Sequence, residues 1–337
     1  MNVPSGDLWA ATKLEILEAI PDGIEVDLSR ALTFYDWRHR GGYHVTGVTK
    51  AEYQLSCSTR EFGSMLAREV SMLLDQAMEH RLLLAQADRA RTAPSPSWLL
   101  VTAYYWCVFL ALAWLRLVGK IVTYLPTAEL DRFKKLAPGD VKKAPQNGTF
   151  ILTTQDLAGA RSNVSCRRLR ANNFHEALWT AFAGDISQRL HASSSATASW
   201  ETRLYSALEV HRAAEGNSWP SKLRNIVNYR IGFGYQACGG HPVPIMLSPL
   251  NVVKSATPEA LIIAIEELHS KVAVRAVESA PNDYTELMVH FGSLLTHVLD
   301  DYSVDVWATR AIDPRWNARR DKYLRSFEMN AATLWPK

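Results

Sequence analysis

The 337-residue sequence has few cysteines and only a small excess of charge of one sign. Its four cysteines, Cys57, Cys107, Cys166 and Cys238, lie far apart and form neither a Cys-x-x-Cys pair nor a Cys/His ligand spacing. The pattern therefore indicates neither a disulfide framework nor a structural zinc site. The formal net charge of +3 is too small to indicate nucleic-acid binding by itself.

Motifs of nucleotide-binding proteins and metalloproteases are also missing. The chain contains no P-loop, Gly-x-Gly-x-x-Gly, His-Glu-x-x-His or Gly-x-Ser-x-Gly sequence. His290 and His297 share one predicted helical face, but their spacing is too wide for the pair alone to chelate a metal ion. We therefore expect no metal ion, no cofactor and no ATP-driven activity. Because Leu8–Ile20 is interrupted by charged residues, we also expect no secretory signal and a cytoplasmic location.

One long apolar run is present, from Trp98 to Leu115. It contains 18 residues without a charge, which as a helix span about 27 Å and could just cross a thin bilayer. Its aromatic residues are spread along its whole length, whereas a membrane-spanning helix keeps Trp and Tyr at the two interfaces. We therefore predict a buried helix, with a membrane span as the alternative.

The chain as a whole is predicted to be mainly α-helical, with a small mixed α/β region at residues 1–92. Ile24–Phe34 and Tyr43–Leu55 are rich in β-branched and aromatic residues and are separated by two glycines, which predicts a hairpin. Ser58–Arg91 has apolar residues at helical spacing. The Pro- and Ser-rich segment that follows separates this region from a helical bundle at residues 93–337.

Within that second region, helical patterns recur down to the C-terminus. Asn147-Gly148 predicts a tight turn and at most a short hairpin. The predicted helices are Trp98–Leu115, Cys166–His191, Trp200–Ala214, Ser221–Arg230, Thr257–Glu278, Tyr284–Val298 and Pro314–Glu328.

Arg170 and His175 form an Arg-x4-His pattern. In a helical bundle such a pair can converge, particularly across a dimer interface. Metal-independent ribonuclease chemistry needs a cation that neutralises the scissile phosphate and a group with a near-neutral pKa that moves a proton. We therefore name Arg170 and His175 as catalytic candidates. The chain has 10 histidines and more arginines, so the alternative is a surface arginine near a histidine that caps or packs its helix.

A second polar group lies in the predicted helix that follows Trp219. Arg224 and Asn228 are four residues apart and share a helical face, with Asn225 and Tyr229 beside them. Polar residues this close together among apolar ones predict a hydrogen-bond network. The functional interpretation is a phosphate or substrate site lined by Arg224 and Asn225. The alternative is that these side chains tie the helix to the Trp219 loop.

Three short segments, in a fixed order, carry a family resemblance. They are Ser97-Trp98 with Ala103-Tyr104-Tyr105 and a closing Gly119, then His175–Trp179, then Leu223–Tyr229. Together they resemble the HEPN-like and YaaC-like helical proteins of bacteria, over about residues 95–235. The resemblance implies an all-helical bundle, often dimeric, encoded in antiphage-defence or toxin–antitoxin loci. Active HEPN members are metal-independent endoribonucleases with Arg-x4-6-His on a late helix, where this chain has Asn228-Tyr229 in place of a histidine.

These observations predict an RNA-directed component of a bacterial defence locus, in the form of a metal-independent endoribonuclease. Arg170 would hold the phosphate and His175 would act as acid or base, while Arg224, Asn225, Asn228 and Tyr229 would bind the substrate. The expected partners are RNA and either a second copy of the chain or a companion defence protein. The alternatives are a non-catalytic subunit that binds a partner protein, and a membrane-anchored effector that inserts Trp98–Leu115.

Overall fold

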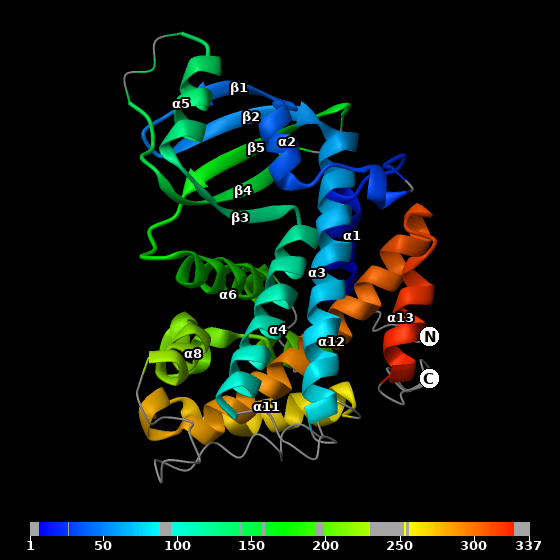
Figure 1. Cartoon of the computed structure of the whole chain (residues 1–337), viewed down its shortest axis with the longest axis vertical. Helices are drawn as coiled ribbons and strands as arrows, with labels where there is room; N and C mark the ends of the chain where they lie inside the picture. Colours follow the sequence, from blue (N-terminus) through cyan, green and yellow to red (C-terminus); the bar gives the residue numbers. More distant parts are fainter. Residues whose placement is uncertain are drawn as a thin grey trace.

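The computed structural model describes residues 7–25, 27–87, 96–139, 141, 143–156, 159–192, 199–229, 253 and 256–326. It contains an antiparallel sheet that lies at one end of a helical body (Figure 1). The strands are β1 (Tyr43–Val48), β2 (Glu52–Ser58), β3 (Lys120–Leu125), β4 (Gly148–Asp156) and β5 (Arg161–Arg168). They are arranged in the order β1-β2-β5-β4-β3.

The helices make up most of the described chain. They are α1 (Asp7–Ala19), α2 (Phe34–Arg40), α3 (Thr59–Ala87), α4 (Pro96–Leu117), α5 (Thr127–Leu136), α6 (Phe174–Ala192), α7 (Trp200–Ala207), α8 (Trp219–Tyr229), α11 (Pro258–Val272), α12 (Pro281–Arg310) and α13 (Trp316–Ser326). The long helices α3 and α4 pack side by side and run down from the sheet into the body, where α12 crosses them (Figure 1).

The sheet corrects the prediction of a helical bundle with a small mixed N-terminal region. Three strands, β3, β4 and β5, come from residues 93–337, where helices and at most one short hairpin were expected. Strand β5 pairs with β2 from the N-terminal region, so the sheet joins segments on both sides of residues 92 and 93. The protein is therefore a helix-rich mixed α/β fold. Strand β5 is not recognisable from the sequence, because its partner β2 lies about a hundred residues earlier and the outward side chains of β5 are polar.

Two local predictions also fail, for reasons visible in the caps. Within Ile24–Phe34 the chain forms a short 3₁₀ turn in place of a strand, because the Asp27 side chain accepts a hydrogen bond from the backbone N–H of Ser29. Thr33 then forms a capping box that starts α2. The hairpin is instead β1–β2. The predicted helix Cys166–His191 begins within β5, and the helix itself starts only at Phe174.

The two faces of the sheet differ in what covers them. On one face α2, α5 and the start of α3 enclose an aromatic cluster in which the ring centroids of Trp37 and Tyr43 lie 5.1 Å apart and those of Tyr53 and Phe133 lie 5.2 Å apart. On the other face α6 contacts β3 and β4, while the polar residues that β1, β2 and β5 carry there are exposed or half-exposed, except for buried Ser165. Antiparallel sheets tolerate water on one face in this way.

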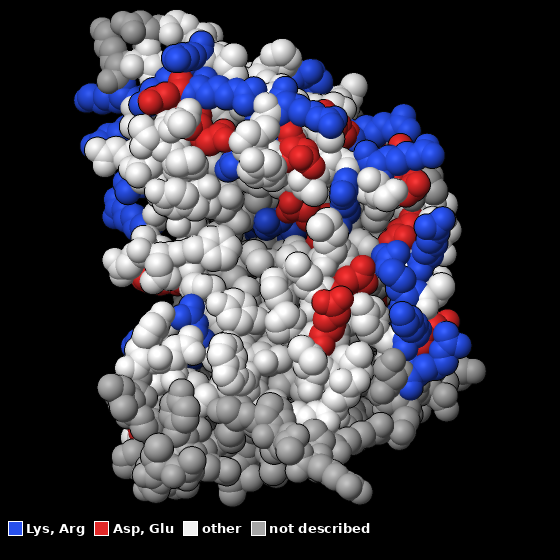
Figure 2. All heavy atoms as spheres, viewed as in Figure 1, with Lys and Arg blue, Asp and Glu red and all other residues white. Residues whose placement is uncertain are grey.

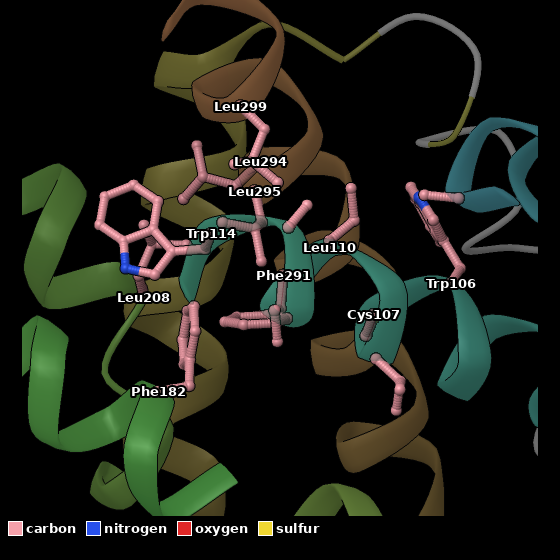
Figure 3. Packing of buried hydrophobic residues seen from close by; sticks show 14 of the residues in the cluster. Trp106, Cys107, Leu110, Trp114, Phe182, Leu208, Phe291, Leu294, Leu295 and Leu299 are labelled. Carbon is pink, nitrogen blue, oxygen red and sulfur yellow. The ribbon is translucent and has the colours of Figure 1, made fainter. Parts of the chain in front are cut away.

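Helix α4 is the apolar run identified in the sequence. It is long and apolar enough to cross a membrane by length and composition, and 72% of its most apolar window is buried inside the fold. Trp106, Cys107 and Trp114 are fully buried; the Trp114 ring lies near Phe182 of α6, and Cys107 faces α12 (Figure 3). A Cβ atom at Gly292 of α12 would lie 2.9 Å from the Cys107 sulfur, so this glycine lets the two helices approach closely. Helix α4 is thus a mostly buried helix of the core.

The end of α4 is set by Gly119, as the sequence suggested. Its φ of +71° is left-handed, which glycine adopts without strain, and its N–H donates to the Arg116 carbonyl. A Cβ at this position would collide with the Thr154 side chain of β4. The chain therefore passes directly from α4 into β3.

A buried charged cluster, which we call the Asp185 cluster, joins the sheet to the helical body. Asp185 on α6 accepts hydrogen bonds from Trp114 Nε1 on α4 at 2.7 Å, from Arg189 Nε at 2.8 Å and from the Lys120 ammonium on β3. Arg189 also donates to the Thr12 hydroxyl on α1. Burial raises the pKa of Asp185, but the two cations outweigh it and leave that pKa below its ordinary value. Every charge in the cluster therefore has an opposite partner.

Candidate active site

His175 lies in the first turn of α6, directly after a polar cap. The Asn173 side chain accepts a hydrogen bond from the N–H of Glu176 at 3.0 Å, and the Glu176 carboxylate accepts one from the N–H of Asn172 at 3.0 Å. These reciprocal bonds hold the start of the helix and therefore the direction in which it presents His175. The histidine is half-buried.

The imidazole of His175 is hydrogen-bonded to Tyr104, which lies in the middle of α4. The Tyr104 hydroxyl and His175 Nδ1 are 2.8 Å apart, and the same hydroxyl lies 3.3 Å from the Ser221 hydroxyl on α8. Tyr104 is fully buried, so its hydroxyl needs these partners. The other ring nitrogen, Nε2, forms no hydrogen bond with any residue that the structure describes.

Helix α8 adds a cation to this group. The Arg224 guanidinium carbon lies 5.3 Å from the centre of the Tyr104 ring, and Nη1 donates to the Asn225 side chain at 2.9 Å. Its Nε is buried and has no hydrogen-bond partner among the described residues. Within the described ranges Arg224 also forms no ion pair, in contrast to Lys222, which pairs with Glu215. An arginine held in place with its charge uncompensated is suited to binding an anion.

The electrostatics of His175 follow from this arrangement. Burial lowers its pKa, and the nearby positive charge of Arg224 lowers it further. The ordinary value is 6.5, so the imidazole is neutral at pH 7 and can accept a proton. We call His175, Tyr104, Ser221, Arg224 and Asn225 the His175 cluster; helices α4, α6 and α8, which supply it, lie next to one another in Figure 1.

In the structure the arginine whose charge acts on His175 is Arg224, not Arg170. Arg170 is exposed and lines an open cavity of about 730 Å³ together with Lys50, Arg167 and Arg168. The charge that acts on His175 is that of Arg224, with no contribution from Arg170. The two arginines named from the sequence therefore lie at different places, one beside the histidine and one at the end of β5.

The remaining residues predicted on α8 have different surroundings. Asn225, Asn228 and Tyr229 are exposed, and Tyr229 is 74% accessible. Asn225 contacts Arg224, whereas the structure gives Asn228 and Tyr229 no hydrogen bond within its described residues. The predicted network on α8 is therefore limited to the Arg224–Asn225 pair.

Sequence reasoning missed Tyr104 and Ser221 as members of the site. The signal for Tyr104 was present, because a tyrosine hydroxyl in the middle of an apolar helix needs a polar partner. Nothing in the sequence identified that partner, since Tyr104 and His175 are 71 residues apart.

The second pair of histidines is buried in α12. Burial and the charge of Arg81 lower the pKa of His297 to about 3, and its Nε2 lies 3.1 Å from the Ala256 carbonyl. His290 Nδ1 lies 2.8 Å from the carbonyl one helical turn earlier. In the described part of the chain, no three His, Cys, Asp or Glu side chains are arranged to hold a metal ion.

Comparison of the chain with known proteins does not assign it to a family. No family model, no curated protein and no solved structure matches it. The resemblance to HEPN-like and YaaC-like proteins stays a prediction, and the chemistry of the His175 cluster has to be inferred from its own residues.

Proposed function

We propose that this protein is a metal-independent endoribonuclease with its reaction centre at the His175 cluster. The observation that carries the proposal is the pairing of a neutral histidine with an arginine whose charge has no partner in the described chain. A phosphodiester supplies the missing negative charge, and cleavage of RNA supplies a hydroxyl proton for the histidine to accept. Arg224 thus takes the role that the sequence gave to Arg170.

The geometry supports the following reaction. Donation from Nδ1–H of His175 to the Tyr104 oxygen, with Tyr104 donating to Ser221, leaves a lone pair on Nε2. Nε2 takes the proton of the ribose 2′-hydroxyl, the 2′-oxygen attacks phosphorus, and the bond from phosphorus to the 5′-oxygen breaks. The products are a 2′,3′-cyclic phosphate and a 5′-hydroxyl, whose proton comes from solvent. Arg224 neutralises the charge that develops on the phosphoryl oxygens.

Partly exposed aromatic rings around the histidine suit an unpaired nucleic-acid strand. The rings of Phe174 and Tyr105 lie 5.8 and 6.3 Å from the His175 ring, and both residues are only half-buried. Bases of single-stranded RNA stack on aromatic side chains of this kind.

The biological setting is proposed from the burial of α4 and from the sequence resemblance. Burial of α4 favours a soluble protein over the membrane-anchored alternative, and a cytoplasmic place in a bacterial antiphage or toxin–antitoxin system rests on the sequence resemblance. A second copy or a companion protein stays the predicted partner. One observation favours the non-catalytic, protein-binding alternative: the outward face of α8 exposes Tyr229, a large side chain with no role in the proposed reaction.

The test is cleavage of a mixed pool of total RNA and tRNA in EDTA. We expect wild type to cleave RNA in EDTA and His175→Ala to be at least about a hundredfold slower. Arg224→Gln should be slower by a similar factor, because removing a preorganised electrostatic donor typically costs about 10²- to 10³-fold. Arg170→Gln is the matched control and should retain the rate at saturating RNA. Absence of cleavage by well-folded wild type, or loss of cleavage in Arg170→Gln but not in Arg224→Gln, would contradict the proposal.

A further inference from the structure

Every charged residue that lines the cavity around Arg170 is a cation. The cavity lies where β5 ends and is lined by Lys50, Ala51, Arg167, Arg168, Leu169, Arg170 and Ala171. Four of these seven residues are cations and none is acidic. Lys and Arg side chains gather along this end of the sheet layer, at the left of the view in Figure 2.

The backbone builds this cavity from two separate segments. The N–H of Arg168 donates to the carbonyl of Ala51 at 3.3 Å, which ties the end of β5 to the β1–β2 turn. The N–H of Leu169 donates to the carbonyl of Thr149 on β4 at 2.8 Å. Lys50 on the turn is therefore held next to the arginines of β5. The Arg168 guanidinium also lies against Gly148, where a Cβ would be 3.1 Å from its Nε.

The charges in the cavity are not neutralised by the fold. None of Lys50, Arg167, Arg168 and Arg170 forms an ion pair or a side-chain hydrogen bond with a residue that the structure describes. The carboxylate nearest in register is Glu52, opposite Arg167 on β2, and it accepts a hydrogen bond from Gln54 at 2.6 Å. Unpaired like charges that lie close together repel one another and destabilise the fold. A bound polyanion would relieve this repulsion, so the arrangement indicates a polyanion-binding site.

The cavity is also close to the His175 cluster in the sequence. Four residues separate Arg170 from His175 in the sequence, so their Cα atoms lie at most about 18 Å apart. We propose that the cavity binds the backbone phosphates of a single RNA strand, a few nucleotides away from the phosphodiester at His175. The inference rests on the proposed function for the identity of the strand. The cavity would then fix the strand without taking part in the chemical step, and Arg170 would be a binding residue.

The experiment measures binding and cleavage separately. A fluorescently labelled single-stranded RNA is titrated in EDTA with wild type, with Arg167→Gln/Arg170→Gln, and with Lys271→Gln/Arg315→Gln as the control. Each double variant removes two exposed charges. Anisotropy is recorded at several salt concentrations.

We expect the cavity variant to bind about tenfold more weakly at low salt, with the slope of log K against log salt reduced by about 1.4. In cleavage it should raise KM and leave kcat unchanged. Equal weakening in the control variant, unchanged affinity in the cavity variant, or no RNA binding by wild type would each overturn the inference. If RNA binding depends on the cavity but wild type cleaves no RNA, the inference that the cavity binds RNA is supported and the ribonuclease proposal is contradicted.

Discussion

Helices α4 and α6 meet through polar contacts at two places, and the two differ in charge balance. Tyr104 contacts His175, and Trp114 contacts Asp185. The two contacts are ten residues apart on each helix, which corresponds to about 15 Å along the helix axis. At Asp185 a buried carboxylate meets two cations and an indole N–H. At His175 a half-buried neutral ring lies beside an arginine with no anionic partner in the described residues.

The difference separates the structural role of the Asp185 cluster from the role that we propose for the His175 cluster. A buried carboxylate whose partners are all present holds elements together and has no capacity left for a ligand. A half-exposed site with an unbalanced charge gains from binding an anion. Both clusters are polar, so burial and charge balance, rather than residue type, distinguish them.

The largest expected effect is on stability, at the Asp185 cluster. Asp185→Asn removes the only carboxylate that contacts both Arg189 and Lys120 in the described residues. Lys120 then has no anionic partner among the described residues and buried Arg189 keeps only the partly exposed Glu15, so the free energy of unfolding should fall by about 3 kcal/mol. Urea denaturation measures this change. Asp321→Asn, at an exposed carboxylate, should change it by less than about 0.5 kcal/mol. Equal midpoints for the two variants would show that the Asp185 cluster is not structural.

A smaller stability effect is expected for Trp114→Phe. This change deletes the indole N–H that donates to Asp185 and leaves the ion pairs in place. Loss of a hydrogen bond to a buried charge should cost about 1.5–3 kcal/mol. RNA cleavage by the folded variant should equal that of wild type, because Trp114 contacts no member of the His175 cluster among the described residues. Loss of cleavage in a stably folded Trp114→Phe variant would contradict the assignment of a purely structural role to the Asp185 cluster.

The matched change at the other contact, Tyr104→Phe, should show the reverse balance. It deletes the hydroxyl that contacts His175 and Ser221, so unfolding should become easier by only about 1 kcal/mol. Cleavage should fall about tenfold, since the imidazole loses the partner that orients it. Tyr105→Phe is the control, because that hydroxyl makes no hydrogen bond in the described structure. Similar rates for the two variants would remove Tyr104 from the site.

The smallest expected effect is a shift in a titration curve. Burial and the charge of Arg224 both lower the pKa of His175 from 6.5. Arg224→Gln removes the second contribution, so the pKa should rise and yet stay below 6.5, because burial remains. The imidazole signals in an NMR pH titration report this value directly, whether or not the variant cleaves RNA. Lys271→Gln should leave the curve in place. An unchanged curve in Arg224→Gln would show that the two side chains do not interact.

Prediction from the sequence succeeded where the signal was local. The long helix expected from Ser58 is present as α3, and the Ser58 hydroxyl accepts the hydrogen bond from the N–H of Glu61 that caps it. The apolar run is helix α4 and ends at Gly119 as expected. The pattern at Thr257 likewise starts α11, with the threonine side chain as the cap. Periodicity and caps depend on residues within a few positions of each other.

Prediction failed where the partner was distant. Strand β5 needs β2 and β4 to form, and its own residues, RSNVSCRR, show no run of apolar side chains. For the same reason Arg170 was paired with His175, its neighbour in sequence. The residue that acts on His175 is Arg224, from a helix nearly fifty positions later.

The sequence by itself determined the long helices α3, α4 and α11 and the buried character of α4, and it singled out Arg170, His175 and Arg224 as candidates. Only the tertiary structure decided that the chain contains a sheet and that His175 lies with Tyr104 and Arg224 while Arg170 lies in a basic cavity. The physical reason is that helix formation is governed by hydrogen bonds and side-chain spacing within a few residues. A site and a sheet are contacts between segments whose meeting depends on how the whole core packs.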